Sequence, residues 1–234
     1  MKLSKRLTHI EQVALAHINE YQHIWDTCCD HGYLGASILS KNPQMQVNFV
    51  DCVPSLISQI EQNLQKFHPN SNAKTHCVDL KKLDLLQSSM PEEGKHLVII
   101  AGVGGELMSE FISNILLNNQ GIAIDFILCP VNYCYHLRES LEHANLGLID
   151  EWLIKENNRF YEILYTSNDS HQHHLLPSKV GEKIWQSDDS KQNLIAKEYL
   201  NKLLCHYRKV EFGGQLDAAD IVRAYEQVKV CEKR

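Results

Sequence analysis

Continuous apolar runs alternate with segments of helical periodicity along the first 165 residues of the chain. The apolar runs lie at residues 24–28, 46–51, 73–78, 96–101 and 126–129. A strand that is apolar along its whole length is buried on both faces, and a parallel sheet covered by helices on both sides provides such burial. The alternation of strands and helices therefore predicts an α/β fold built around a parallel sheet.

The end of this unit follows a different pattern. Two further apolar runs, at 148–154 and 160–165, are joined only by residues 155–159. So short a link makes an antiparallel hairpin, because a parallel partner needs a crossover of about a dozen residues or more. A parallel sheet that finishes in an antiparallel edge hairpin is typical of a Rossmann-like class I methyltransferase. We expect that domain over residues 1–167.

The remaining residues, 178–234, predict a small helical hairpin. Apolar side chains follow alternating steps of four and three residues, at Ala196, Leu200, Leu203, Tyr207 and Val210. This spacing is that of a packed helix face. Glycines at 213 and 214 predict the end of the first helix. The hairpin would pack on the main domain or clasp a partner.

Net charge and the length of the apolar runs limit the partners and the cellular location that the chain can have. The chain has 234 residues, a formal net charge of -6 and a pI near 6.1, which argues against non-specific nucleic-acid binding. A local basic face can still contact RNA, and Lys5, Arg6 and Arg138 are candidates. There is no signal-peptide pattern, and no apolar run reaches the roughly 18 residues of a membrane span. We expect a cytoplasmic protein without membrane contact.

Cysteine spacing argues against a metal site. The chain has 8 cysteines and no CxxC pair. Structural zinc sites use such pairs at short spacing. No metal is therefore expected.

Acidic side chains mark the ends of several predicted strands. Asp26 and Asp30 flank Cys28-Cys29, where a dinucleotide-binding turn would have glycines. Two acids would repel a pyrophosphate and attract a cationic sulfonium with its ammonium group. Asp51 ends the second strand and suits the two hydroxyls of a ribose. Asp79, after the third strand, suits an adenine amino group. These positions predict a cofactor such as S-adenosylmethionine.

Two later turns reach the same edge of the predicted sheet. The fourth strand runs into Ala101-Gly102-Val103-Gly104-Gly105, whose glycines permit positive φ and a close approach of ligand. Pro130-Val131-Asn132 follows the fifth strand, and Asn132 could bond a base edge. Both turns are candidates for the floor of an active site.

A set of short motifs occurs in order along this domain. They are residues 3–7 (Leu-Ser-Lys-Arg-Leu), 26–34 with the core sequence Asp-His-x-Tyr-Leu at 30–34, 101–105, Pro130 with Asn132, 136–139, 148–151, and Tyr161-Glu162. As a set they resemble TrmK, a family of bacterial tRNA (adenine-N1)-methyltransferases. The chain departs from the family pattern at Cys28, Cys29, Asp51 and Val103, where glycine is usual at 28, glutamate at 51 and methionine at 103.

The resemblance implies S-adenosyl-L-methionine as the methyl donor. It implies N1 of an adenine in the D-arm region of tRNA, conventionally position 22, as the acceptor. It also implies cofactor contacts from Asp26, Asp30, His31, Gly32, Asp51, Asp79, Ala101, Gly102 and Gly104.

Transfer to adenine N1 needs no base before attack, because N1 carries an in-plane lone pair. Catalysis then depends on alignment of donor and acceptor in a water-poor pocket. Asp30 is our candidate for stabilising the positive charge that arises on the base. A base-paired adenine must be flipped out, against Tyr33 or Asn132. Lys5, Arg6 and Arg138 are candidates to hold RNA phosphates.

Two other functions remain open at this point. The same scaffold could methylate another RNA or a different substrate. Alternatively, the chain could bind a cofactor or partner without turnover, through the helical hairpin. A dehydrogenase is least supported, because the glycines of a pyrophosphate turn are missing and an edge hairpin is unexpected.

Overall fold

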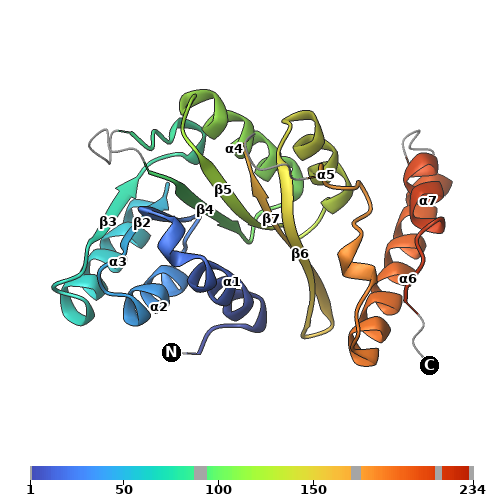
Figure 1. Ribbon diagram of the computed structural model, residues 1–234, viewed down its shortest axis with the longest axis horizontal. Helices are drawn as coiled ribbons and strands as arrows, with labels where there is room; N and C mark the ends of the chain where they lie inside the picture. The colour runs from blue at the N-terminus through green and yellow to red at the C-terminus, as the bar shows by residue number, and fades with distance from the viewer. Residues whose placement is uncertain (1, 87–93, 170–174, 214–217, 232–234) are drawn as a thin grey trace.

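The computed structural model of the chain describes residues 2–86, 94–169, 175–213 and 218–231, and its centre is a seven-stranded sheet (Figure 1). The strands are β1 (His23–Thr27), β2 (Gln46–Asp51), β3 (Ala73–Cys77), β4 (His96–Ala101), β5 (Ile124–Cys129), β6 (Gly147–Glu156) and β7 (Arg159–Ser167). Their order across the sheet is β3-β2-β1-β4-β5-β7-β6. All five predicted parallel strands are present.

The antiparallel edge hairpin is confirmed, with one detail that the sequence did not give. β7 lies between β5 and β6 and pairs antiparallel with both. The five remaining strands, β1 to β5, are parallel to one another. An all-parallel dinucleotide-binding sheet has the order 3-2-1-4-5-6. The inserted antiparallel β7 distinguishes this sheet from that arrangement and matches a Rossmann-like methyltransferase.

Helices cover both faces of the sheet (Figure 1). One face packs against α1 (Lys5–Ala16), α2 (Tyr33–Lys41) and α3 (Pro54–Phe67). The other packs against α4 (Gly105–Asn118) and α5 (Cys134–His143). Side chains alternate across a strand, so Ile24 joins the first core and Trp25 the second. Burial on both faces explains why these strands are apolar throughout.

Helix boundaries follow local capping chemistry. Ser4 caps α1, and its hydroxyl oxygen accepts a hydrogen bond from the backbone N–H of Leu7 at 3.4 Å. Pro54 opens α3, where its missing N–H costs nothing. α1 ends at Ala16, and a 3₁₀ turn (Ile18–Glu20) follows it. Two further 3₁₀ turns lie at Leu80–Lys82 and Lys183–Trp185.

The predicted C-terminal helical pair is present. α6 (Ser190–Phe212) and α7 (Ala218–Glu226) pack together beside the β6–β7 hairpin (Figure 1). Their shared core includes Tyr207 and Tyr225, whose rings stack with centroids 5.9 Å apart. It also includes Leu153 of β6, so the helical pair shares side-chain packing with the sheet domain. Division of the chain at 167 and 178 stays a prediction.

Arg138 corrects one of our expectations. Its side chain is fully buried, with Nη2 at 2.6 Å from Glu151 Oε2 and 2.7 Å from Glu162 Oε2. A guanidinium enclosed in this way has no access to an RNA phosphate. Glu162 Oε1 also accepts a hydrogen bond from the Tyr199 hydroxyl of α6 at 2.7 Å. Arg138 therefore anchors the hairpin strands and, through Glu162, connects to the C-terminal helices.

None of the helices in the described residues is long and apolar enough to cross a membrane. No group of three or more His, Cys, Asp or Glu side chains gathers around a possible metal position in the same residues.

Candidate active site

A crevice opens where the strand order reverses. The chain runs outward from β1 to β3 and then crosses back to β4 on the other side of β1. The carboxyl ends of β1 and β4 diverge into loops at this point, which is where open α/β sheets bind ligands. A cavity of about 370 Å³ lies there. Its lining comprises Arg6, Leu7, Asp26, Thr27, Cys28, Cys29, Asp30, His31, Tyr33, Leu34, Ala101 and Gly102.

The loop after β1 is shaped by left-handed backbone. Cys28, Asp30 and Gly32 have φ values of 50°, 51° and 68°. Such values are uncommon for residues with a side chain, so hydrogen bonds must hold the turn. The Gly32 N–H donates to the Cys29 carbonyl at 2.7 Å, and the Cys29 N–H donates to Val50 of β2 at 3.3 Å. The backbone of this loop is thereby tied to β2.

Cys28 keeps the left-handed backbone that a glycine would adopt without strain. Its thiol is half-buried, and burial, followed by the nearby Asp51 carboxylate, raises its pKa to about 12. Burial likewise raises the pKa of Cys29. Both thiols are therefore neutral near pH 7 and form an apolar wall rather than a nucleophile.

Asp26 lies at the bottom of the crevice. Its side chain is buried, and Oδ2 accepts a hydrogen bond from the Gly35 N–H of α2 at 2.8 Å. Burial raises the pKa of Asp26 to about 7, although the Gly35 hydrogen bond opposes that shift. The carboxyl is thus poised to ionise near neutrality. A cation placed beside it would favour the charged form.

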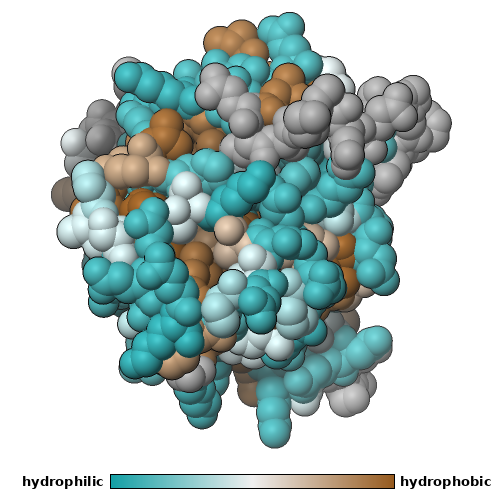
Figure 2. Space-filling view, turned by 90° about the vertical axis from the view of Figure 1, so that its left-hand side faces the viewer, coloured by the Kyte–Doolittle hydropathy of each residue, from teal (hydrophilic) through white to brown (hydrophobic). Residues whose placement is uncertain are grey.

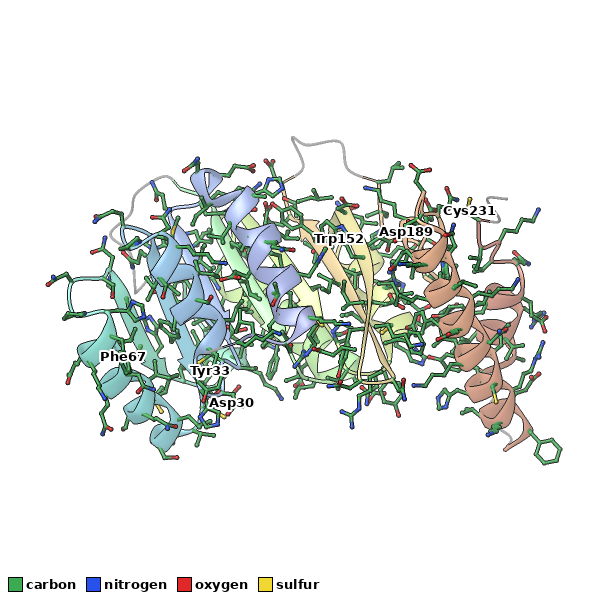
Figure 3. All side chains as sticks on the ribbon, turned by 90° about the horizontal axis from the view of Figure 1, so that it is seen from below. Asp30, Tyr33, Phe67, Trp152, Asp189 and Cys231 are labelled. Atoms are coloured by element: carbon green, nitrogen blue, oxygen red, sulfur yellow. The ribbon has the colours of Figure 1, made fainter. Side chains whose placement is uncertain are left out.

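Asp30 lies at the mouth of the crevice, next to Tyr33 at the start of α2 (Figure 3). Its side chain is 72% exposed, and its Oδ1 lies 3.6 Å from His31 Nε2. The backbone N–H of Asp30 donates to Asp51 Oδ2 at 3.1 Å, while Asp51 Oδ1 accepts from the Val53 N–H at 3.0 Å. Asp51 therefore supports the loop that carries Asp30.

Arg6 forms the opposite wall. Its guanidinium lies over the Tyr161 ring, 5.0 Å from the centroid, and Nη1 donates to Cys129 Sγ at 3.9 Å. A Cβ added to Gly102 would lie 3.7 Å from Arg6 Nη2. The crevice thus has a cation on one side and the carboxyls of Asp26 and Asp30 on the other.

The two later turns pack against each other. The Gly105 N–H donates to the Asn132 carbonyl at 3.0 Å, and the Val131 N–H donates to the Val103 carbonyl at 3.0 Å. A Cβ on Gly105 would meet the Tyr133 carbonyl oxygen at 2.5 Å. Glycine at this position is therefore required by the close approach of the two backbones.

The structure brings most of the predicted cofactor residues to one place. Asp26, Asp30, His31, Ala101 and Gly102 line the crevice together with Tyr33 and Arg6. The other predicted residues lie around the crevice. Gly32 is in the loop after β1, and Asp51 accepts a hydrogen bond from that loop. Asp79 caps the 3₁₀ turn at Leu80–Lys82 by accepting a hydrogen bond from the Lys81 N–H at 3.0 Å, Gly104 and Asn132 are in the two paired turns, and Lys5 is exposed at the start of α1.

Sequence reasoning missed two residues of this site. Gly35 has no room for a Cβ, which would lie 2.4 Å from Phe49 and 3.0 Å from Asp26 Oδ2. A glycine inside a predicted helix was the available signal. Thr27 donates its hydroxyl to the Ile99 carbonyl at 2.7 Å and joins β1 to β4 beside the crevice. No sequence pattern indicated that contact.

The sheet order, the antiparallel edge hairpin and the acid-lined crevice define a Rossmann-like methyltransferase fold. Residues 3–164 match the family described as a methyltransferase domain. This chain belongs to that family.

Individual proteins give a consistent comparison. A Mycoplasma genitalium protein provisionally described as a tRNA methyltransferase is 28% identical over 144 residues, so the match spans 60% of this chain and 60% of that protein. TrmK of M. capricolum with S-adenosylhomocysteine has a TM-score of 0.74 at 18% identity, covering 97% of both chains. The B. subtilis tRNA m1A22 methyltransferase TrmK has a TM-score of 0.71 at 19% identity, covering 97% of this chain and 98% of that one. These structural likenesses show that the fold extends through the C-terminal helices.

Proposed function

We propose that this protein is an S-adenosylmethionine-dependent methyltransferase acting on N1 of an adenine, at position 22, in tRNA. One observation carries the proposal: the crevice at the β1–β4 switch point places two carboxyls opposite one guanidinium. The likeness to TrmK structures over the whole chain supports the choice of substrate. The cytoplasm, where tRNA is modified, is the matching location.

The charges of the crevice fit the amino-acid end of the cofactor. That end carries a sulfonium, an ammonium and a carboxylate. Asp26 and Asp30 would hold the cationic groups, and Arg6 would hold the carboxylate. We assign Arg6 to this role in place of an RNA phosphate, because its guanidinium lies within the crevice wall.

The nucleoside end would lie toward β2 and β3. Asp51 ends β2 and Asp79 comes after β3, where they would accept hydrogen bonds from ribose hydroxyls and an adenine amino group. The half-buried thiol of Cys28 gives this part of the crevice an apolar wall. When bound, S-adenosylmethionine supplies an electrophilic methyl group.

The residues of this chain would contribute to the reaction by positioning the adenine and by stabilising the charge that develops on it. Asp30 stands at the mouth of the crevice with an exposed carboxylate, where it would stabilise the positive charge developing on the methylated adenine. Tyr33 and Asn132 offer a ring and an amide to a flipped-out base. Lys5 at the start of α1 remains the candidate for RNA phosphate.

The test is incubation with labelled S-adenosylmethionine and total tRNA, followed by mapping of the modified nucleoside. We expect 1-methyladenosine at position 22. Label on another nucleoside would assign a different substrate, and cofactor binding without any transfer would favour a non-catalytic module.

Asp30→Ala tests the catalytic residue within this proposal. We expect a loss of at least about 100-fold in kcat, in line with the removal of one charge-stabilising group. Because the Asp30 side chain is exposed, the variant should remain folded, with only a small loss of stability from alanine at a φ of 51°. Wild-type turnover in Asp30→Ala would remove this carboxylate from the mechanism.

A further inference from the structure

A second hollow lies beside the crevice, between α2 and α3. Its volume is about 680 Å³, within the range of pockets that bind small molecules. Phe49, Ile60 and Leu64 form an apolar floor, and the side chains of Gln59 and Asn63 stand at its edge. Figure 2 shows the side of the molecule that carries β3, α2 and α3, where apolar surface is visible in hollows between polar side chains.

The hollow adjoins the crevice at two aromatic residues. His31 and Tyr33 line both cavities. Their rings stack with centroids 5.3 Å apart and planes at 28°, and Tyr33 is 43% exposed. Gln59 Oε1 lies 3.1 Å from His31 Nδ1 and fixes the imidazole from the α3 side. The stacked pair therefore forms a partition between the proposed reaction site and the hollow.

The chemistry of the lining selects a neutral aromatic ligand. None of the described residues that line the hollow is Asp, Glu, Lys or Arg. Two amides, two serine hydroxyls and two imidazoles offer hydrogen-bond donors and acceptors instead, from Gln59, Asn63, Ser37, Ser40, His31 and His68. An unpaired nucleobase is recognised by this combination of stacking rings and hydrogen bonds to its edges.

A positive charge lies beside one of the aromatic residues that line the hollow. Phe67 lines the far end, is 62% exposed, and has Lys66 Nζ 5.0 Å from its ring centroid (Figure 3). Lys66 is exposed at the end of α3. A cation beside an aromatic ring is suited to a base with its attached phosphate.

We propose that the α2–α3 hollow binds an unpaired base of the RNA substrate, adjacent to the adenine that enters the crevice. This inference rests on the proposed function and extends it. The His31–Tyr33 pair would separate the two bases, with the target on the crevice side and its neighbour on the hollow side. The free-energy cost of unpairing the RNA at the target would then be offset by contacts to two bases rather than one.

The test uses the full-length double variant Asn63→Ala/Phe67→Ala. Both side chains are exposed on α3, so the fold should be kept. We expect KM for tRNA to rise at least tenfold, while the Kd for S-adenosylmethionine stays the same and kcat at saturating tRNA stays within threefold. The matched control is Gln62→Ala/Gln65→Ala, on the same helix and outside the lining, with wild-type KM.

A second measurement identifies the occupant as a base. A tRNA transcript carrying an abasic nucleotide on one side or the other of the target adenine is titrated with wild type and with the double variant. We expect one of the two abasic positions to weaken wild-type binding at least fivefold and to leave binding by the variant unchanged. Equal loss in both proteins, or an unchanged KM in the variant, would overturn the inference.

The two proposals fail in different ways. If wild type transfers no methyl group to tRNA, the proposed function fails. The inference that the hollow binds a base fails separately, if wild type methylates tRNA but neither the double variant nor the abasic positions change RNA binding.

Discussion

The Asp51 carboxylate accepts a hydrogen bond from the backbone N–H of Asp30 at 3.1 Å. This bond joins the acid at the end of β2 to the loop after β1, and it holds Asp30 in the left-handed conformation, with φ of 51°. The position proposed for the ribose and the position proposed for catalysis are therefore coupled through the backbone. A substitution at Asp51 should therefore also alter the backbone conformation at Asp30.

Asp51→Ala should weaken binding of S-adenosylmethionine at least tenfold by calorimetry. The substitution removes the proposed ribose acceptor and the acceptors of the Asp30 and Val53 N–H groups. Asp51→Asn keeps one oxygen and should show a smaller loss. An unchanged Kd in Asp51→Ala would contradict the ribose assignment.

Asp26→Asn should stabilise the ligand-free protein above pH 7. The pKa of Asp26 is raised from 3.8 to about 7, so between these values the unfolded chain loses a proton that the folded protein keeps. Folding stability from this group therefore falls as pH rises through that window and stays lower above it. At about 1.4 kcal/mol per pKa unit, the penalty is on the order of 4 kcal/mol.

Urea unfolding at pH 4 and pH 8 measures this effect. Wild type and Asp26→Asn should be similar at pH 4, and the variant should be the more stable at pH 8. The same variant should bind S-adenosylmethionine more weakly, because it lacks the carboxylate that a cation would favour. Equal stability at both pH values would show that Asp26 is not desolvated as described.

Arg138→Met should destabilise the protein by about 3–5 kcal/mol, because it leaves Glu151 and Glu162 buried without their cation. The matched control is Arg223→Ala, whose partner Asp220 is 74% exposed. That change should cost no more than about 0.5 kcal/mol. Urea unfolding monitored by tryptophan fluorescence compares the two, and an equal cost would refute the buried ion network.

Gly105→Ala should slow methyl transfer far more than Gly104→Ala. At position 105 a new Cβ would meet the Tyr133 backbone oxygen at 2.5 Å, so the two turns must separate. A Cβ at position 104 would meet the Asn132 side-chain oxygen at 2.7 Å, and that side chain can rotate away. We expect at least a 30-fold loss of kcat for the first and a smaller loss for the second, where only the Asn132 amide is displaced. A reversed order in single-turnover assays would contradict this account.

Much of the fold could be predicted because its signals are local. The strands at 46–51 and 96–101 have the predicted bounds, since apolar runs of that length are buried on both faces wherever they lie in such a sheet. The short link at 155–159 dictated an antiparallel hairpin. Which hairpin strand pairs with β5 depends on contacts between segments far apart in the chain, and the sequence did not indicate it.

The site was predictable to the same extent. Asp26 lies near the end of a strand that stops at the switch point, and Asp30 lies in the loop after it, so topology alone brings both to the crevice. The arginines could not be placed in this way. Arg6 and Arg138 are long side chains in polar segments, and their sequence surroundings look alike. One lies in the crevice wall and the other is sealed between two glutamates.

The sequence by itself determined the α/β class, the edge hairpin and the acids at the strand ends, because side-chain period, link length and the residues next to each apolar run are local properties of the chain. Only the tertiary structure decided which charges face the crevice, which are buried as ion pairs, and that His31 and Tyr33 stand between two cavities. Those properties depend on how separate helices pack, since packing sets which side chains lose water and which keep it.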